Sequence, residues 1–533
     1  MYNNYTPLQQ RQLALQEYSN TQSTYLLVCA PARSTALKST LTDQLHRKFR
    51  LVDRLDGELT ASVDGVLLAA EDVELMSTAL MYFAKALQDG ADYAVCNAVF
   101  GFGGATALYQ SQPLQAQNRC AVVSRALLER CRAAAHDPEN VPELLALAAQ
   151  LCTKPALIPQ ALLHYERGIC AEDAFSAHGK RAFIMSHVLD MTGAPIVLVS
   201  AVPVLRSMGY EVLVLGPSDG GSLHLFLDAG ASVITRSSCR NVSDAWGMAL
   251  CADFVIVNTV VMARAVRALS GTAVPVLWWL HDAFAGYPHI AHQIPRELGE
   301  NIRLYSVGSH AANAMRAVRP EFEIRPLIYG LPDYAAENFV RTDLGYNRGR
   351  PLFATVGSFE RRKGHDIFCK AIRLLPPEVR EKASFLFVGQ AADKEMMDSV
   401  RTLTADYPEN VYYCKRLTRD EIKSLMEQCT GLVCASRDDP MPTFVTEGLI
   451  FGKPSIVSEH TGTAGLISEG RNGFVYHDDD PQQLAVLLEH AIEHPEELAS
   501  MRTECRKMYE QYYSKEAFEQ TLRTAVEDLT EKK

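Results

Sequence analysis

Short apolar segments alternate with stretches of helical hydrophobic spacing along the chain from residue 180 onward. The runs RAFIMSHVL (181–189) and EVLVLGP (211–217) predict buried strands, and the apolar stretch 193–208 between them predicts a helix that Gly209 ends. Similar runs follow up to residue 337. Strands of this kind separated by helices are typical of parallel βαβ units. The pattern therefore predicts an α/β fold.

A polar break at 338–350 separates this block from a second block of the same kind, 351–480, and the remaining residues 481–533 have a charged helical pattern. We predict two facing Rossmann-like domains at 176–340 and 341–480, with carboxy-terminal helices that pack back across both. Residues 1–175 predict a third α/β unit of different texture. Because open parallel sheets bind ligands at the carboxyl ends of their strands, residues that follow strands are the candidate site residues.

Composition and charge narrow the class of protein. The 533 residues suffice for three or four domains, and 47% hydrophobic with 22% charged residues is ordinary for globular chains. A net charge of −11 disfavours nonspecific binding of nucleic acid. The 13 cysteines, scattered without CxxC pairs, predict reduced buried thiols in a cytosolic protein and argue against a disulfide framework or a zinc site.

The chain shows no segment typical of secretion or membrane insertion. Residues 1–20 are polar, unlike a signal peptide, and the most apolar stretch, 194–205, is shorter than the roughly 20 residues that span a bilayer. We therefore expect a cytoplasmic protein. Basic residues within 33–50 leave peripheral association with the inner face of the membrane open.

The strongest group of candidate residues lies in 435–454, ASRDDPMPTFVTEGLIFGKP. An apolar strand ends there, an acidic proline-containing loop follows, and a helix is expected to begin near Thr443. Amides and the positive dipole end at a helix start suit a phosphate, and carboxylates can accept hydrogen bonds from sugar hydroxyls. The candidates are Met441, Thr443 and Phe444 for a phosphate and Asp439 and Glu447 for hydroxyls. Taken alone, the segment fits a solvated loop with an acid near a helix start better than it fits a binding site.

Cations follow the first strand of the second block, in 356–366, VGSFERRKGHD. The turn begins at Gly357 and carries Arg361, Arg362 and Lys363. Cations clustered after a strand can hold a diphosphate, although a surface basic turn is the alternative.

Two weaker signals lie in the first block. His281 comes directly after the apolar run AVPVLWWL, where it can bond a substrate hydroxyl or act as a buried structural histidine. In MTGAPIV (191–197), Gly193 and Ala194 allow a ligand to approach the backbone closely at a helix start, although the segment is not GxGxxG.

Together these motifs resemble the retaining glycosyltransferases of family 4, which have the GT-B architecture, and the resemblance runs through 183–480. Gly193–Ala194 is similar to the family's glycine-rich loop, and His281 to the histidine that contacts the donor sugar. The matching positions in the second block are Gly357 with Lys363 and Gly364 for the diphosphate motif, Asp439 and Glu447 for the paired carboxylates, Gly452 and Pro454 after them, and 461–476 for the G…I..G.NG.L segment.

The sequence departs from the family pattern at three places. The first carboxylate is Asp439 in place of Glu, which shortens its reach by one methylene. Ser358 stands where the family has Arg, so Arg361 or Arg362 must supply that charge. The usual E-G-F-G loop reads D-P-M-P, which removes two backbone donors. We interpret these departures as a subfamily variant.

The resemblance implies a nucleotide-sugar donor on the second domain, with its diphosphate on Lys363, an arginine and the amides of 443–444. Glu447 would bind the ribose and Asp439 the transferred hexose, which would pass with retention to a glycan, a lipid-linked glycan or a protein. Fixed cations and amides stabilise the leaving group, so neither a metal nor a cofactor is expected. The acceptor hydroxyl would attack from the face that the phosphate leaves, and this phosphate would take its proton. Polysaccharide biosynthesis and protein glycosylation in a bacterium fit this activity.

Residues 1–175 resemble shortened pieces of family 2 glycosyltransferases, which have the GT-A fold. That fold implies an Asp-x-Asp metal motif after a strand, and AAEDVEL offers only Glu71 and Asp72 nearby. We predict a degenerate, inactive accessory domain that holds an acceptor, a partner subunit or a second copy of the chain.

Two other functions remain open at this stage. One is an inactive glycosyltransferase-like binding or scaffold subunit, for which the departures at Ser358 and D-P-M-P leave room. The other is a nucleotide-sugar epimerase, which would convert the donor without an acceptor. A pyridoxal-phosphate phosphorylase is disfavoured, since nothing marks a Schiff-base lysine.

Overall fold

The structure is a computed structural model, and it forms two compact units, Met1–Ile256 and Val257–Lys533, which we describe in turn. The described residues are 23–29, 35–41, 44, 46, 48–52, 54–55, 62–69, 73–76, 78–102, 106–110, 120–165, 179–218, 220–236, 239, 248–477 and 479–531.

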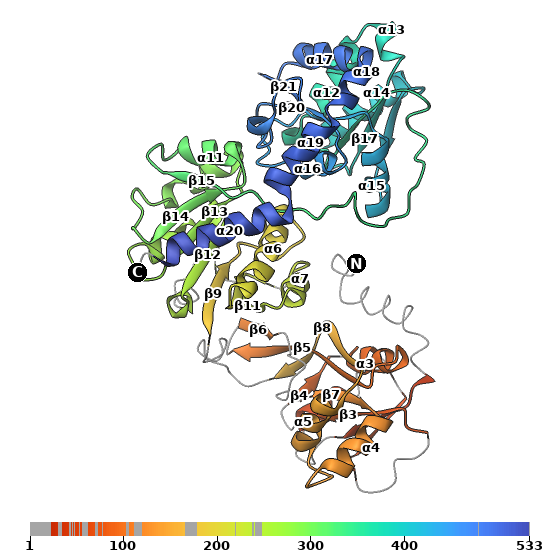
Figure 1. The fold of residues 1–533 in the computed structure, drawn as a ribbon, viewed down its shortest axis with the longest axis vertical. Coiled ribbons are helices and arrows are strands. Elements are labelled where there is room, and N and C mark those ends of the chain that lie inside the picture. Colours follow the sequence, from red (N-terminus) through yellow and green to blue (C-terminus); the bar gives the residue numbers. More distant parts are fainter. Residues whose placement is uncertain are drawn as a thin grey trace. The chain divides into compact units, whose positions relative to one another are not determined.

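The first part of unit Met1–Ile256 is a mixed sheet with helices on it (Figure 1). β1 is parallel to β2 and β3, whereas β7 runs antiparallel between β3 and β5. Alternate residues of β3 enter two apolar clusters, Leu67 beside Phe83 and Val66 beside Leu128, so the sheet is covered on both faces. The strands are β1 Leu26–Cys29, β2 Phe49–Val52, β3 Gly65–Ala69, β4 Val73–Leu75, β5 Tyr93–Phe102, β6 Thr106–Gln110, β7 Cys120–Ser124 and β8 Pro155–Tyr165. The helices are α2 Thr35–Thr40, α3 Ala79–Gln88, α4 Arg125–Ala134 and α5 Val141–Leu151.

The second part of this unit is the start of the first predicted Rossmann-like block. β9 (Lys180–Met185), β10 (Tyr210–Gly216) and β11 (Ser232–Arg236) are parallel, and β6 of the preceding sheet adds antiparallel to β11. The predicted helix is α6, Gly193–Ser207, and it ends before Gly209 at φ +86°. The other elements are α7 Leu223–Asp228, the short helix η3 Met248–Cys251 and β12 Phe254–Asn258, which lies at the division between the units.

Unit Val257–Lys533 opens with three parallel strands, β13 (Val276–Leu280), β14 (Ile302–Ser306) and β15 (Ile324–Pro326). β13 has the sequence VLWWL and is buried throughout, as expected for a strand covered on both faces. The helical segments here are η4 Val260–Met262, α9 Ala263–Leu269, η5 Phe284–Gly286, α10 Tyr287–Ile290, η6 Ala291–Gln293 and α11 Ser309–Arg316.

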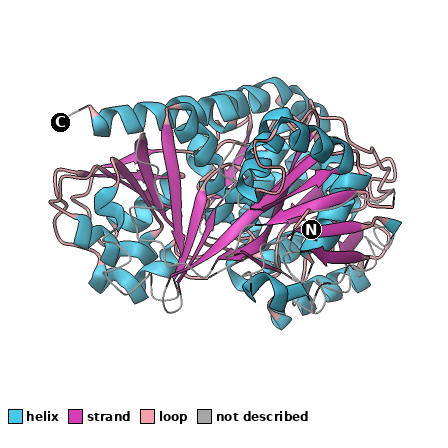
Figure 2. Cartoon of the chain, turned by 90° about the horizontal axis from the view of Figure 1, so that it is seen from below, coloured by secondary structure: helices cyan, strands magenta, loops and turns pink. Residues whose placement is uncertain are grey.

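The same unit holds a six-stranded, wholly parallel sheet in the order β18-β17-β16-β19-β20-β21, flanked by helices (Figure 1). Figure 2 shows all strands of the chain in magenta and all helices in cyan. β16 and β19 are central neighbours although β17 and β18 lie between them in the chain. The strands are β16 Leu352–Val356, β17 Ser384–Val388, β18 Val411–Cys414, β19 Gly431–Cys434, β20 Ser455–Ser458 and β21 Gly473–Tyr476. The helical segments are η7 Arg361–Lys363, α12 His365–Leu374, α13 Pro377–Arg380, α14 Lys394–Asp406, α15 Arg419–Gln428, α16 Thr443–Ile450, η8 Ala464–Leu466 and α17 Pro481–Glu493.

The carboxy-terminal helices run from α18 (Pro495–Ser500) through α19 (Arg502–Met508) and a π-helical turn η9 (Tyr509–Tyr513) to α20 (Lys515–Thr530). Phe518 of α20 stacks on Trp279 of β13, with ring centroids 5.8 Å apart. None of the described helices combines the length and the apolar composition needed to cross a bilayer. The observed elements confirm the predicted α/β fold, while the four-part division of the chain stays a prediction.

Candidate active site

The loop after β16 is shaped by a close approach to the end of β19. Gly364 adopts φ +66°, and a Cβ atom added there would overlap the carbonyl oxygen of Ala435. Only glycine meets both conditions without strain. At the start of the loop, the position of a Cβ on Gly357 faces open space. The glycine directly after Lys363 thus fixes the backbone conformation of the turn that carries this lysine.

Lys363 forms an ion pair with Asp439, with Nζ 2.5 Å from Oδ2, and the Asp439 side chain is almost fully buried. The second oxygen, Oδ1, accepts the amide of Met441 at 3.3 Å. Behind the lysine, burial and the charge of Lys363 lower the pKa of His365 to about 3, so this imidazole is neutral. The two predicted ligand residues, Lys363 and Asp439, therefore meet, and the Met441 amide is already used by Asp439.

The two arginines of the turn differ in their contacts. Arg361 is exposed, whereas Arg362 donates to the Glu360 carboxylate and to the Asp438 carbonyl, each at 2.9 Å. A third arginine, Arg437, ties the turn to the loop after β19. It donates to Arg361 O at 2.9 Å and, from two nitrogens, to Asp366 at 2.8 Å each.

Helix α16 begins at Thr443, as predicted. Among the described contacts, the amides of Thr443 and Phe444 donate no hydrogen bond, so both remain available to an anion. Glu447, one turn further, accepts Arg419 Nη1 at 2.6 Å, and its side chain is 10% exposed. Burial raises the pKa of Glu447, and the neighbouring Arg419 opposes that rise.

His281 lies directly after β13, half-buried, and its imidazole packs on the Trp279 indole with centroids 4.7 Å apart. The next residue, Asp282, accepts the amide of Val260 at 2.6 Å, and burial raises the pKa of Asp282 to about 6. The strand end thus carries a histidine next to an acid that titrates near neutrality.

The loop after β13 is bound to the loop after β19 through Asp438. Its carboxylate accepts the amides of Phe284 and Ala285 at 3.1 and 2.9 Å and contacts His310 Nε2 at 2.6 Å. Burial favours a higher pKa for Asp438, but the bonds from His310 and the two amides outweigh it, so the pKa lies below its usual value. Sequence reasoning missed Asp438 and His310. The doubled acid in DDPMP, and a histidine shortly after β14, were the available signals.

The remaining predicted residues belong to unit Met1–Ile256 or fall outside the described residues. Gly193 and Ala194 begin α6 in unit Met1–Ile256, and their role stays a prediction. Glu71 and Asp72 lie outside the described residues. Within the described part of the chain, no group of three or more His, Cys, Asp or Glu is arranged to hold a metal ion.

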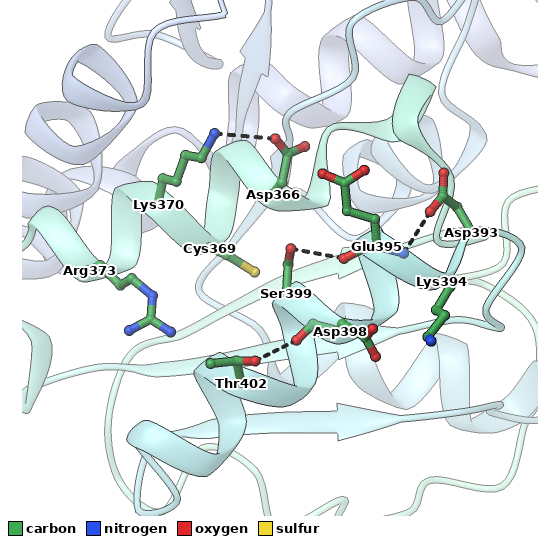
Figure 3. Close-up of a pocket in the computed structure, with 10 residues that line it drawn as sticks. All are labelled: Asp366, Cys369, Lys370, Arg373, Asp393, Lys394, Glu395, Asp398, Ser399 and Thr402. Atoms are coloured by element: carbon green, nitrogen blue, oxygen red, sulfur yellow. Dashed lines mark hydrogen bonds and ion pairs between the residues drawn. The ribbon is translucent and has the colours of Figure 1, made fainter.

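A solvent-open groove of about 770 Å³ lies between α12 and α14 (Figure 3). Its lining mixes charges, with Lys370 3.6 Å from Asp366. Asp366 is also the partner of Arg437, so the groove adjoins the support of the site and not its candidate ligand residues.

Two parts of the chain match the models of glycosyltransferase families. The model of the family described as "Glycosyl-transferase family 4" matches residues 178–314, and that of "Glycosyl transferases group 1" matches residues 337–508. With the parallel α/β sheets, these matches show the GT-B fold, as the motifs implied, and the matched parts of the chain are similar to glycosyltransferases. Neither match includes 1–175, so the GT-A-like character of that part stays a prediction.

Two curated relatives have low sequence identity to the chain. The chain is 28% identical over 160 residues to spore coat protein SA of Bacillus subtilis (strain 168), which is 28% of this chain and 41% of that protein. It is 26% identical over 198 residues to the uncharacterized glycosyltransferase MJ1178 of Methanocaldococcus jannaschii, which is 36% of this chain and 53% of that protein. The chain thus spans about half the length, or less, of these curated relatives.

Solved structures show the same fold. Anabaena Alr3699/HepE in complex with UDP has a TM-score of 0.53 at 18% identity, and sucrose-phosphate synthase from Thermosynechococcus elongatus has 0.53 at 14%. Each comparison covers 66% of this chain and 100% of the other. At these identities, the likeness concerns the fold alone.

Proposed function

We propose that the chain is a retaining glycosyltransferase that moves a hexose from a nucleotide-sugar donor to a glycan, a lipid-linked glycan or a protein. One observation carries the proposal. At the carboxyl ends of the neighbouring strands β16 and β19, an ion pair of the half-buried Lys363 with the buried Asp439 lies in the chain shortly before a helix start with two available amides and a buried Glu447. Cations and amides suit a diphosphate, and acids suit the hydroxyls of two sugars.

The donor would exchange partners within the site. Its diphosphate carries the charge to take Lys363 from Asp439, and the amides of Thr443 and Phe444 would hold the same group. Asp439, relieved of the lysine, would accept hydroxyls of the transferred hexose, and Glu447 those of the ribose. Anabaena HepE, which is similar in fold, has structures with UDP and with UDP-glucose, which supports a nucleotide-sugar donor here.

In this proposal, the leaving group is stabilised by electrostatic interactions. Lys363 and the helix amides stabilise the charge that develops on the departing phosphate, without a metal. The acceptor hydroxyl attacks the anomeric carbon from the face that the phosphate leaves. The new C–O bond forms as the C–O bond to phosphate breaks, and a phosphate oxygen takes the acceptor proton. His281 would contact the donor sugar.

The test is a panel of UDP-, GDP- and ADP-sugars measured by thermal shift, since a ligand at 100 times its Kd stabilises a protein by roughly 2.7 kcal/mol. Lys363→Ala should abolish the shift, while the control Lys370→Ala, an exposed lysine of α12, should keep it. Turnover is followed with EDTA present, and NMR reads the anomeric configuration of the product.

Each outcome identifies a function. A glycoside with the donor's anomeric configuration supports the proposal. Binding without turnover on any acceptor class would indicate a binding or scaffold subunit. A new nucleotide sugar formed without an acceptor would indicate an epimerase. No binding by any donor would overturn the proposal.

A further inference from the structure

Glu447 has a partner from another helix that the paired-carboxylate pattern does not include. Arg419 is the first residue of α15, and its Nη1 lies 2.6 Å from Glu447 Oε1. The start of α15 is fixed by a capping box, in which Thr418 Oγ1 accepts the Glu421 amide and the Glu421 carboxylate accepts the Thr418 amide. The guanidinium thus extends from a well-ordered backbone position.

The guanidinium of Arg419 also contacts an aromatic ring. Arg419 Cζ lies 4.2 Å from the ring centroid of Tyr334, in the segment that joins β15 to β16. One turn further along α15, the buried Lys423 pairs with Glu337 of the same segment at 2.7 Å and lies 5.4 Å from the Phe339 ring. Arg419 and Lys423 of α15 therefore both contact the joining segment, and Arg419 contacts Glu447 as well.

We infer that Arg419 is a positioning residue, which fixes one carboxylate oxygen of Glu447 and leaves the other to accept hydroxyls of the donor. The inference rests on the proposed function, because it assigns a task to Arg419 within donor binding. A stacked guanidinium with a planar fork loses little freedom in this role, whereas a lysine would supply the charge without the stacking.

The charged and titratable groups around Glu447 predict a pH dependence that can be measured. The titratable groups that face Glu447 are Arg419 of α15 and, from the joining segment, Tyr334 and Tyr329. Burial raises the pKa of both tyrosines, that of Tyr329 to about 12, so both stay neutral near neutral pH. Burial also raises the pKa of Glu447, and Arg419 opposes that rise. Without Arg419, the pKa of Glu447 rises further, and the carboxylate is protonated as the pH falls.

The experiment measures Kd for UDP, GDP and ADP as probes between about pH 5 and pH 8. For the probe that the wild type binds, Arg419→Gln should weaken binding about 10- to 100-fold, the usual loss of a hydrogen bond to a charged group. The weakening relative to the wild type should grow as the pH falls. Arg419→Lys should restore the wild-type pH dependence but only part of the affinity.

A matched control is available in Arg341. It stacks on Phe339 at 4.7 Å and makes a salt bridge with Glu427 of the same helix α15, so it differs from Arg419 in the acid that it contacts. Arg341→Gln should leave the Kd and its pH dependence unchanged. A readout without ligand uses the melting midpoints of Arg419→Gln, Glu447→Gln and the double variant, whose effects should be clearly non-additive.

The outcomes separate the inference from the proposed function. If the wild type binds a probe but Arg419→Gln weakens it equally at every pH, or the midpoint effects add, Arg419 has a general structural role and the inference is overturned alone. If the wild type binds no probe, the proposed function and the inference both fail.

Discussion

Gly364→Ala tests how strictly the turn after β16 is specified. Gly364 directly follows Lys363 and has φ +66°, a conformation in which an L-residue costs roughly 1–2 kcal/mol. The added Cβ would also lie closer than 3.0 Å to the carbonyl oxygen of Ala435, a separation that real Cβ atoms essentially never show. Because the contact is with backbone, either Ala435 or the turn must move.

Relief of such an overlap costs typically 1–3 kcal/mol, so the total for Gly364→Ala is about 2–5 kcal/mol. The movement displaces Lys363 from Asp439, and binding of a nucleoside diphosphate should weaken with it by at least 10-fold, the usual loss of one charge-assisted hydrogen bond at about 1.5–3 kcal/mol. We therefore expect a lower melting midpoint and a loss of UDP or GDP affinity in the same variant.

Gly470→Ala is the matched control. Gly470 has φ +69°, almost the same conformation, but a Cβ there meets nothing within 4 Å. The Gly470→Ala variant should lose only the roughly 1–2 kcal/mol of stability that the backbone conformation costs, and it should keep its nucleotide affinity. The two variants are compared by calorimetry and by isothermal titration. If they lose equal stability and both bind nucleotide as the wild type does, the close approach to Ala435 does not shape the site, and the reasoning is refuted.

Three further predictions concern unit Val257–Lys533. Hydrogen bonds to Asp438 lower its pKa against the effect of burial, so its contribution is present above about pH 4 and lost as the pH falls through the lowered pKa. The gap in melting midpoint between the wild type and Asp438→Asn should narrow on acidification, and a constant gap would contradict this. For Asp282, burial raises the pKa to about 6, so its contribution is present below about pH 4 and lost as the pH rises through 6. Asp282→Asn should therefore flatten the wild-type decline in midpoint over that window, and parallel profiles would argue against it. Phe518→Ala removes the ring stacked on Trp279 and should cost about 3–5 kcal/mol in denaturant unfolding followed by tryptophan fluorescence. Val486→Ala, at an exposed position, should stay within about 0.5 kcal/mol, and equal losses would exclude a packing role for Phe518.

Local sequence signals were sufficient for the elements that carry the site. Helix α6 was predicted over 193–208 and spans Gly193–Ser207, because its apolar pattern is long and Gly209 provides a clear stop. Helix α16 begins at Thr443, directly after Pro442, because a proline keeps the residue before it out of the helical conformation, and Gly452 at φ +70° follows the end of the helix. In both cases the deciding residues lie within one turn of the boundary.

The partners of the site residues could not be predicted in the same way. Lys363 and Asp439 are 76 positions apart and meet because β16 and β19 pair, although β17 and β18 intervene in the chain. Strand order is a tertiary property that no local spacing encodes. Arg419 and Arg437 were missed for the same reason, since a single arginine on a helix or in a loop carries no pattern until its acid is placed beside it.

The internal pairing also changes how the motif is understood. The family pattern treats each acid and each cation as a separate contact to the donor, yet here Lys363 is bound to Asp439 and Arg419 to Glu447. Ion pairs with a buried member give little net stability, because desolvation offsets the attraction, so folding alone is a weak reason to keep them. Under the proposed function, the ion pairs have a clearer reason to be kept. Each pair keeps a buried acid in place until the donor arrives, and the diphosphate then replaces the carboxylate on Lys363. The shorter side chain of Asp439 fits this exchange, since it keeps the carboxylate within reach of the lysine in the turn.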